Sequence, residues 1–389
     1  MAGYEVFGEE ERQAVNEIFD LNGGVIFAHG FDAMRNGVYR VREFEAAFAH
    51  KLGANYGQAV SSGTAAVKVA LQALGVGPGD EVITQAYTFV ATVEAILETG
   101  ATPIIVDIND TLNMDPGAFE NAITKQTKAV IPVHMMGEGA DMGPIMAIAK
   151  KHKLLVMEDA AQALGASYKG QRLGTIGDAG AFSTDAGKTL NTGEGGVILT
   201  NDIKVYNLAR GVHDHGHEYS SNLGRGEEGA ICRGFNYRMT EIHGAIGLAQ
   251  LKKLDMIINN QRANKAKIMA GLHDLGVPFR NSLDPQGDIS DTIVFYMPNR
   301  EITHQFVAAM RDKGLGTKNL PDAIGWHFSK HWEHLLKDHD IYGGNLDTIW
   351  SKSADILECS IAIPVGVIMD DTKIKEITSN ILKIGKNLL

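Results

Sequence analysis

Short apolar runs alternate with amphipathic segments between residues 57 and 200. Seven of these runs are typical of buried strands, because they are brief and rich in β-branched or other apolar side chains. They lie at residues 59–60, 81–84, 103–107, 129–134, 154–158, 179–183 and 196–200. Between them, residues 65–74, 90–99 and 145–152 carry apolar side chains at helical spacing. The alternation predicts an α/β fold in which helices cover both faces of a large, mostly parallel sheet.

The pattern changes beyond Thr240. Thr240 is a candidate N-cap for a helix whose apolar positions continue toward Leu272, and a helix of this length is expected to link two domains. Further on, a strand over residues 292–297 and a helix over 303–313 are expected. We therefore predict a large domain over residues 1–255 and a small C-terminal α+β domain over residues 256–389.

Composition and charge narrow the class of protein. The chain has 389 residues, 44% hydrophobic and 21% charged, which is typical of a soluble globular protein with more than one domain. The net charge of −11 argues against nucleic-acid binding, which needs a clustered basic surface. The acidic first residues and the lack of a long apolar stretch predict neither a signal peptide nor a membrane span, so we expect a cytoplasmic protein. Cys232 and Cys359 lack the spacing of a disulfide framework or a metal site.

Three segments near predicted strand ends carry side chains suited to pyridoxal phosphate (PLP). The turn at residues 61–66 precedes a helix, where free backbone N–H groups favour a phosphate, and Gly63 permits close approach. Asp159 can pair with a protonated pyridine nitrogen. The amine of Lys188 can hold the cofactor aldehyde as a Schiff base. Because ligands gather at the carboxyl ends of parallel strands, these segments are expected to form one site.

Each of these residues also has an ordinary structural explanation. The turn at 61–66 is equally suited to capping its helix, and Asp159 is equally suited to capping a helix over residues 160–163. Lys188 taken alone resembles a surface lysine, and Phe89 taken alone resembles a core aromatic rather than a ring that stacks on a cofactor. The order of these features along the chain is what favours a PLP site.

Seven stretches resemble one enzyme family over nearly the whole chain. They are residues 61–66 (SSGTAA), 87–92 (YTFVAT), 132–134 (PVH), 158–163 (EDAAQA), 182–183 with Lys188, 192–196 (TGEGG) and 234–239 (GFNYRM). On these stretches the chain is identified as a member of the DegT/DnrJ/EryC1/StrS family of PLP-dependent sugar aminotransferases. The resemblance implies the aspartate aminotransferase fold, fold type I, with a large sheet domain and a small C-terminal α+β domain.

The resemblance also implies roles in cofactor binding and catalysis. Lys188 is implied to hold PLP as a Schiff base and to be the catalytic residue, while Asp159 pairs with the pyridinium nitrogen. The other implied contacts are Phe89 stacked on the ring, Gln162 near the ring hydroxyl, Gly63, Thr64 and Ser183 at the phosphate, and Asn236 at the phosphate of the neighbouring subunit. A homodimer with shared active sites is therefore expected.

The implied reaction moves an amino group from glutamate to a keto-sugar, with Lys188 as general base and then general acid. Synthesis of surface polysaccharide or lipopolysaccharide sugars is the implied setting. Residues 31–36 and 213–217 resemble a subset that makes 8-amino-3,8-dideoxy-manno-octulosonate (8-amino-Kdo). Tyr87, His215 and His327 are candidate substrate contacts.

The chain departs from the family pattern beside the lysine. Thr184 and Asp185 follow Phe-Ser where the family usually has an aromatic residue and a histidine, and Gly187 stands where a bulkier residue is common. These differences bear on substrate contacts more than on the cofactor. In the small domain, Trp326, His327 and Lys330 are further candidates for binding an acidic group of a substrate.

Three alternatives remain open from the sequence. His213, His215 and His217 would share one face of a strand and suggest a metal, but no cysteine set accompanies them and we expect no metal. A PLP-dependent sugar dehydratase or epimerase is a second alternative, although the family's dehydratases carry histidine where this chain has Lys188. A regulatory protein on a degenerate scaffold is the third, and it would be expected to lose Lys188 or Asp159.

Overall fold

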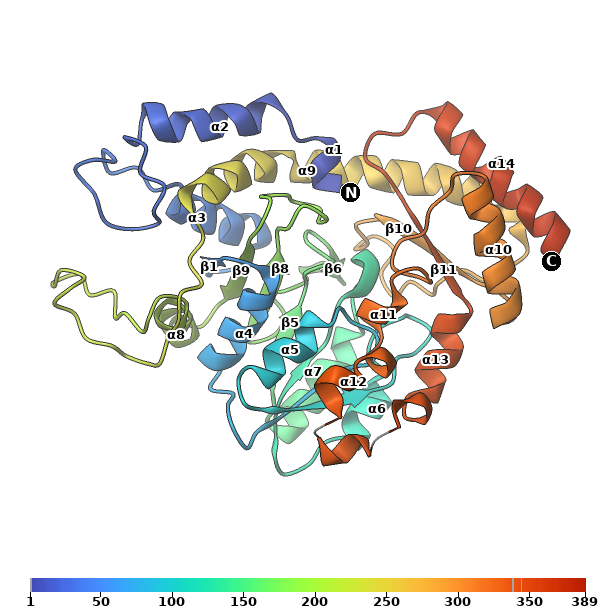
Figure 1. Cartoon of the computed structure of the whole chain (residues 1–389), viewed down its shortest axis with the longest axis horizontal. Coiled ribbons are helices and arrows are strands. Elements are labelled where there is room, and N and C mark those ends of the chain that lie inside the picture. The colour runs from blue at the N-terminus through green and yellow to red at the C-terminus, as the bar shows by residue number, and fades with distance from the viewer. Residues whose placement is uncertain (1, 338, 344) are drawn as a thin grey trace.

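A seven-stranded sheet forms the centre of the large domain in the computed structural model, which describes residues 2–337, 339–343 and 345–389 (Figure 1). The strand order is β1-β9-β8-β5-β4-β2-β3. The strands are β1 (Tyr56–Val60), β2 (Glu81–Gln85), β3 (Thr102–Val106), β4 (Thr127–Ile131), β5 (Leu155–Asp159), β8 (Ala179–Ser183) and β9 (Gly196–Thr200). All seven predicted strands are thus confirmed within a few residues.

Five neighbouring strands are parallel, and one strand reverses direction. β8, β5, β4, β2 and β3 run parallel, while β9 lies between β1 and β8 and is antiparallel to both. The parallel strands are apolar on both faces because helices cover both sides, and every residue of β8 and β9 is buried. The prediction of a mostly parallel sheet is confirmed, with the antiparallel β9 as a feature that the apolar pattern does not reveal.

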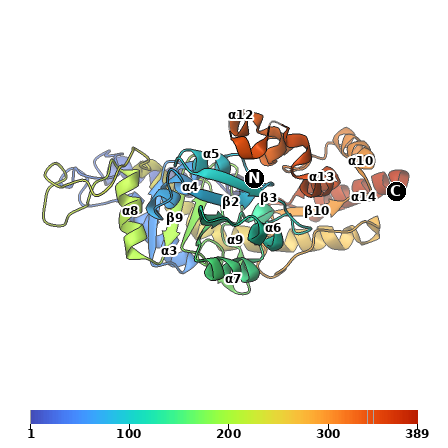
Figure 2. The same ribbon diagram turned by 90° about the horizontal axis from the view of Figure 1, so that it is seen from below.

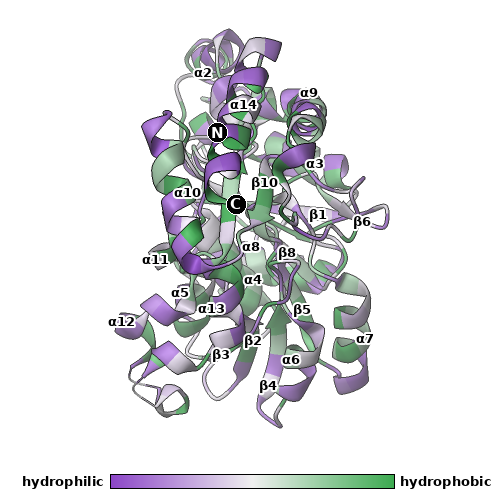
Figure 3. Cartoon of the chain, turned by 90° about the vertical axis from the view of Figure 1, so that its right-hand side faces the viewer, coloured by the Kyte–Doolittle hydropathy of each residue, from purple (hydrophilic) through white to green (hydrophobic). Residues whose placement is uncertain are grey.

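Helices form a layer on each face of the sheet (Figure 2). One face packs against α4 (Gly63–Ala73), α5 (Ala91–Leu97) and α8 (Ile203–His213), and the other against α3 (Arg40–Leu52), α6 (Pro116–Asn121) and α7 (Met142–His152). Figure 3 shows the expected pattern, with mostly hydrophobic strands inside and hydrophilic stretches on peripheral helices such as α2 (Glu9–Asp20). A two-stranded hairpin, β6 (Ser167–Tyr168) and β7 (Gln171–Arg172), lies outside the sheet.

The helix predicted after Thr240 is α9 (Glu241–Gly271), which runs along much of the molecule (Figure 1). It packs against α2 and α3 toward one end and against α14 (Asp371–Leu388) toward the other. Thr240 is the N-cap residue, but its side chain makes no capping bond and instead contacts His243 Nδ1 at 3.1 Å. The boundary predicted between residues 255 and 256 falls within this continuous helix and stays a prediction.

The C-terminal part has its own small core. β10 (Thr292–Tyr296) and β11 (Ser360–Pro364) form an antiparallel pair that packs with α9, α10 (Arg300–Asp312) and α14. Short helices α11 (Ile324–His327), α12 (Glu333–Leu336) and α13 (Ser351–Glu358) return the chain to the large domain, where they pack beside α5 and β3. No helix in the described residues is long and apolar enough to cross a membrane.

Candidate active site

A cavity of about 640 Å³ lies between the large and small domains. The large domain contributes the carboxyl end of β5, the first turn of α4 and the turn after β8, so segments far apart in sequence meet as expected. The predicted residues that line it are Gly63, Thr64, Phe89, Asp159, Gln162, Ser183, Lys188 and His327. The small domain adds Gln261, Asp291, Thr317, Lys318 and Asn319.

Lys188 lies in the turn after β8, with a side chain that is 21% exposed toward this cavity. Its Nζ is 3.7 Å from Asp185 Oδ2, and its backbone N–H donates to the Asp185 carbonyl at 3.0 Å. Helix α1 (Ala2–Glu5) supports the turn, because the N–H of Gly3 donates to the Lys188 carbonyl at 3.1 Å. The amine is therefore held near one carboxylate and opens into the cavity.

Asp159 ends β5 with a buried carboxylate. Its Oδ2 accepts from Thr92 Oγ1 at 2.8 Å, and its Oδ1 accepts from the N–H of Ala161 at 3.1 Å. No lysine, arginine or histidine in the described chain pairs with it. The alternative of a helix N-cap is wrong, because residues 160–166 form turns in which the N–H of Ala160 bonds to β8. A buried carboxylate without a cationic partner fits a protonated pyridinium nitrogen.

The start of α4 provides donors suited to a phosphate. Ser62 caps the helix by accepting from the N–H of Ala65 at 3.1 Å, which leaves the first-turn N–H groups at Gly63 and Thr64 without intrahelical partners. A Cβ on Gly63 would lie 2.6 Å from the Cβ of Ser183, so only glycine permits this approach. Ser183 Oγ is 3.1 Å from Asp185 Oδ2 and lines the same cavity.

Phe89 and Gln162 line the same cavity as Asp159 and the first turn of α4. Phe89 is 42% exposed, lines the cavity and has its ring 5.4 Å from the ring of His327, so it is not a core aromatic. An aromatic face left open inside a cavity fits a flat heteroaromatic ring. Gln162 Oε1 accepts from the N–H of Met136 at 3.2 Å and from Asn319 Nδ2 at 3.4 Å, which fixes the side chain at the cavity wall. Together with Lys188 and Asp159, these residues fit PLP.

His327 is held in one tautomer by its surroundings. Its Nδ1 is 2.8 Å from the Ala323 carbonyl, which can only accept, so Nδ1 carries the proton. Burial lowers the pKa of His327 below its ordinary value, and the neighbouring positive charge of Lys188 adds to this effect. The imidazole therefore presents Nε2 as a neutral acceptor, and the prediction that His327 contacts substrate remains a prediction.

Three other predicted residues lie outside this cavity in the single chain. Tyr87 is fully buried in the core, with its ring 6.3 Å from that of His327. His215 and Asn236 lie in the loop over residues 214–237, and Asn236 is exposed. The substrate roles of Tyr87 and His215 and the role of Asn236 at a neighbouring subunit's phosphate stay predictions.

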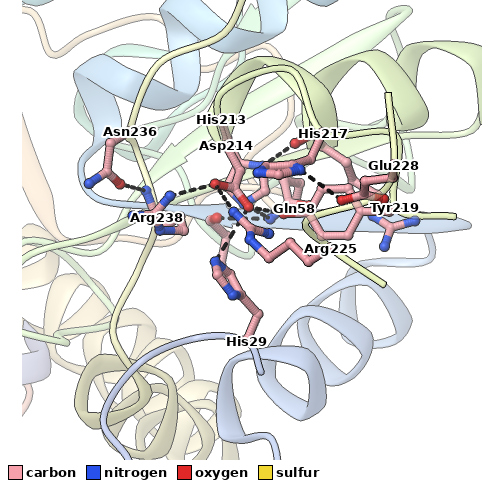
Figure 4. A network of polar contacts seen from close by, with 12 residues as sticks. His29, Gln58, His213, Asp214, His217, Tyr219, Arg225, Glu228, Asn236 and Arg238 are labelled. Carbon is pink, nitrogen blue, oxygen red and sulfur yellow. Dashed lines mark hydrogen bonds and ion pairs between the residues drawn. The ribbon is translucent and has the colours of Figure 1, made fainter. Parts of the chain in front are cut away.

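Asp214 organises the loop that carries His215 and Asn236 (Figure 4). Its buried carboxylate accepts from Tyr219 Oη at 2.7 Å, from Arg225 Nη2 at 2.6 Å and from Arg238 Nη1. Burial alone would raise the pKa of Asp214, but the hydrogen bonds from Arg225, Tyr219 and Arg238 outweigh it and hold this pKa well below its ordinary value. A permanently charged aspartate therefore ties both ends of the loop together.

The three histidines of this segment do not share a face. The ring of His213 contacts Gln58 Nε2 at 3.2 Å, His217 Nδ1 pairs with Glu228 at 2.7 Å, and His215 has a left-handed backbone with φ of 55°. A shared face would require a strand, but residues 213–217 form the end of α8 and the start of a loop. In the part of the chain that the structure describes, no group of three metal-ligating side chains forms.

The small-domain wall contains residues that the sequence patterns did not indicate. Lys318 Nζ donates to Asp291 Oδ2 at 2.5 Å, and both residues line the cavity. By contrast, Lys330, which was predicted as a possible anion contact, does not line the cavity and lies 3.5 Å from Asp347. No local motif distinguishes the two lysines, because only the packing of the small domain against the large one decides which of them reaches the cavity.

Comparisons with known proteins agree with this geometry. The family model described as "DegT/DnrJ/EryC1/StrS aminotransferase family" matches residues 28–382. The aminotransferase from Psychrobacter cryohalolentis has a similar structure, with a TM-score of 0.87, 27% sequence identity and 98% of each chain covered. The GDP-perosamine synthase of Caulobacter vibrioides is 45% identical over 215 residues, which are 55% of this chain and 56% of that protein. The GDP-perosamine synthase of Escherichia coli O157:H7 is 44% identical over 223 residues, or 57% and 60% of the two chains.

The fold and the cavity define a PLP-dependent enzyme of fold type I, as the sequence resemblance implied. The chain belongs to the DegT/DnrJ/EryC1/StrS aminotransferase family. Its alignments with these two curated relatives span little more than half of their length.

Proposed function

We propose that the protein transfers an amino group from glutamate to a keto-sugar. The observation that carries this proposal is the meeting in one cavity of Lys188, the exposed ring of Phe89 and the carboxylate of Asp159, which has no cationic partner in the described residues. PLP, when bound, supplies an electron sink that makes a proton on an adjacent carbon removable. The lysine at position 188, rather than histidine, favours amino transfer over the dehydratase alternative.

Several of the residues that line the cavity have their own roles in the proposed reaction. Lys188 Nζ would hold the cofactor, and its amine, when free, would take the proton from the α-carbon of the amino donor as a base and return it as an acid. The carboxylate of Asp159 keeps the pyridine nitrogen protonated, because a buried anion favours a positive charge beside it. The first turn of α4 and Ser183 bind the phosphate, and the small domain closes the cavity on the other side.

The proposed acceptor is the keto-sugar precursor of 8-amino-Kdo, made in the cytoplasm for surface polysaccharide or lipopolysaccharide. The resemblance of residues 31–36 and 213–217 to that subset supports it. His29, two residues before the first segment, has its Nε2 3.5 Å from Oδ2 of Asp214 in the second segment. A GDP-linked keto-sugar is the second candidate, because two curated relatives are GDP-perosamine synthases.

We also propose that the active unit is a homodimer with shared sites. The segment before α3 and the loop over residues 214–237 both lie at one end of the molecule (Figures 1 and 2), and both carry large apolar side chains that are exposed. They are Phe27, Phe31, Met34, Leu223, Ile231 and Phe235. Asn236 is exposed beside Phe235, as a residue that completes a partner's site must be. A second copy would cover this apolar surface.

The first experiment records the visible absorbance of the PLP-loaded protein before and after glutamate is added without any sugar. We expect glutamate to bleach the cofactor's visible band with release of 2-oxoglutarate in equal amount. Lys188→Ala should abolish this conversion, whereas Lys330→Ala should retain it because Lys330 lies outside the cavity. A wild-type band that ignores glutamate, or a fully active Lys188→Ala variant, would contradict the proposal.

A further inference from the structure

The cavity has an excess of negative charge. Its lining includes the carboxylates of Asp159, Asp185, Glu194 and Asp291, against the amines of Lys188 and Lys318. His327 adds no positive charge, because burial lowers its pKa and favours the neutral ring. No arginine lines the cavity in the residues that the structure describes. A carboxylate-bearing ligand therefore has few groups to bind in this chain.

Lys188 would not be available to such a ligand, because in the proposed function its amine would hold the cofactor and carry the proton. Lys318 is the remaining cation at the cavity wall of the described chain. Its side chain is 27% exposed, and its ammonium group has three donors, of which Asp291 Oδ2 takes one. Two donors remain for a ligand.

The surrounding chain holds Lys318 in place. Its backbone N–H donates to the Ala362 carbonyl at 2.8 Å, and the N–H of Val365 donates to the Asp291 carbonyl at 2.9 Å. Burial would raise the pKa of Asp291, but the charge and hydrogen bond of Lys318 outweigh it and hold that pKa below its ordinary value. The pair is therefore ionised and anchored to β11, so little ordering is needed when a ligand binds.

We propose that Lys318 binds a carboxylate of the substrate in the active site. This inference rests on the proposed function, because glutamate carries two carboxylates and an octulosonate carries one. A charge-assisted hydrogen bond from Lys318 would offset the repulsion from Asp185 and Glu194. The same lysine serves both half-reactions if both ligands present a carboxylate at this wall.

The test uses glutarate, a five-carbon dicarboxylate that lacks the reactive amine of glutamate. Isothermal titration calorimetry of glutarate into the PLP-loaded protein should give a dissociation constant about tenfold higher or more for Lys318→Met than for the wild type. Lys330→Met is the matched control, because Lys330 is 23% exposed, faces a single aspartate and lies outside the cavity. Lys318→Arg keeps the charge and should recover most of the affinity.

A structural effect is separated from ligand binding in two ways. Lys318→Met leaves Asp291 unpaired, which alone can destabilise the protein. The double variant Lys318→Met/Asp291→Asn removes the whole ion pair and is compared when the single variant unfolds at a lower temperature. PLP affinity of the cofactor-free protein, measured by fluorescence titration, should stay within about twofold of wild type in both variants if Lys318 serves the substrate and not the fold.

Two measurements on Lys318→Met show which ligand supplies the carboxylate: the affinity for glutarate, and the rate at which 8-amino-Kdo converts the cofactor. A loss of glutarate affinity assigns it to the amino donor. Unchanged glutarate affinity with slower conversion of the cofactor by 8-amino-Kdo assigns it to the sugar. If Lys318→Met and Lys330→Met have the same glutarate affinity and the same rate of conversion by 8-amino-Kdo, the inference is wrong. A wild-type cofactor band that does not respond to glutamate contradicts the proposed function instead, and the glutarate titration still decides the role of Lys318.

Discussion

Gly63 and Ser183 belong to segments that are 120 residues apart, and they approach each other closely at the wall of the cavity. The space between them is smaller than one methyl group, since a Cβ on Gly63 would lie 2.6 Å from Ser183 Cβ and 3.0 Å from Ser183 Oγ. Both predicted phosphate contacts therefore depend on the absence of a side chain at one position. A displacement of a few tenths of an ångström at this contact is therefore expected to change the affinity for the cofactor.

Gly63→Ala should weaken PLP binding. The added methyl group must push the first turn of α4 away from Ser183, and overpacking of this kind typically costs about 1–3 kcal/mol. We expect the dissociation constant of PLP, measured by fluorescence titration of the cofactor-free protein, to rise by about tenfold or more. Gly77→Ala is the control, because no atom lies within 4 Å of a Cβ there. Equal PLP affinities in the two variants would show that the Gly63 contact is unimportant.

The loop over residues 214–237 depends on buried polar groups at the end of α8. His213 Nδ1 is 2.5 Å from the Arg210 carbonyl, and its Nε2 faces Gln58 Nε2, so the surroundings accept only the neutral ring. Burial lowers the pKa of His213 to about 4. The next residue, Asp214, gathers Arg225, Arg238 and Tyr219 around one carboxylate. The element that presents Asn236 is therefore sensitive to acid.

His213 should make the protein less stable as the pH falls from about 6.5 to about 4. Its pKa is lower in the folded state than in the unfolded chain, so the unfolded chain binds more protons in this range and stability is lost. With about 1.4 kcal/mol for each pKa unit, the loss is about 3 kcal/mol across the range. Differential scanning calorimetry from pH 7 to pH 4 should show a smaller fall in Tm for His213→Gln than for wild type.

The exposed His273 provides the control for this measurement, because His273→Gln should leave the pH dependence of Tm as it is in wild type. A His213→Gln variant whose Tm falls as steeply as that of wild type would contradict the assignment.

At the scale of the whole molecule, the proposed homodimer raises the question of which chain supplies Asn236 to each cavity. Asn236 and the exposed Phe235, Ile231 and Leu223 stand on a loop away from the cavity of their own chain. If the proposed homodimer forms, each cavity receives Lys188 from one chain and Asn236 from the other. The arrangement predicts complementation between two defective variants.

Lys188→Ala and Asn236→Ala chains should each have low activity but recover it when they are mixed under conditions that exchange subunits. A hybrid dimer then contains one site with both native residues, so an equal mixture should reach about a quarter of the wild-type rate. The measurement is release of 2-oxoglutarate from glutamate with a keto-sugar present. No recovery in hybrids whose formation is shown by native mass spectrometry would place both residues in the same subunit's site.

Local chemistry explains why much of the cofactor site was predictable. Asp159, Ser183 and the 61–66 turn directly end or follow apolar strands, and parallel strands carry such positions to one edge of the sheet. The seven strands were predictable because burial on both faces leaves a continuous apolar run, and the start of α9 was predictable from Thr240 as an N-cap and the helical spacing of the apolar residues after it. The family resemblance then assigned roles that spacing alone leaves open.

The sequence by itself determined the fold class, the cofactor and the turn that carries Lys188, because the fold class follows from the alternation of apolar runs and helical segments, and the other two follow from the order of short motifs along the chain. Only the tertiary structure decided that β9 runs antiparallel, that Asp159 has no cationic partner in the described chain, and that Lys318 rather than Lys330 reaches the cavity. These features depend on which distant segments pack together. The physical reason is that burial and charge pairing are properties of a residue's neighbours in space, and the order of residues along the chain does not specify those neighbours locally.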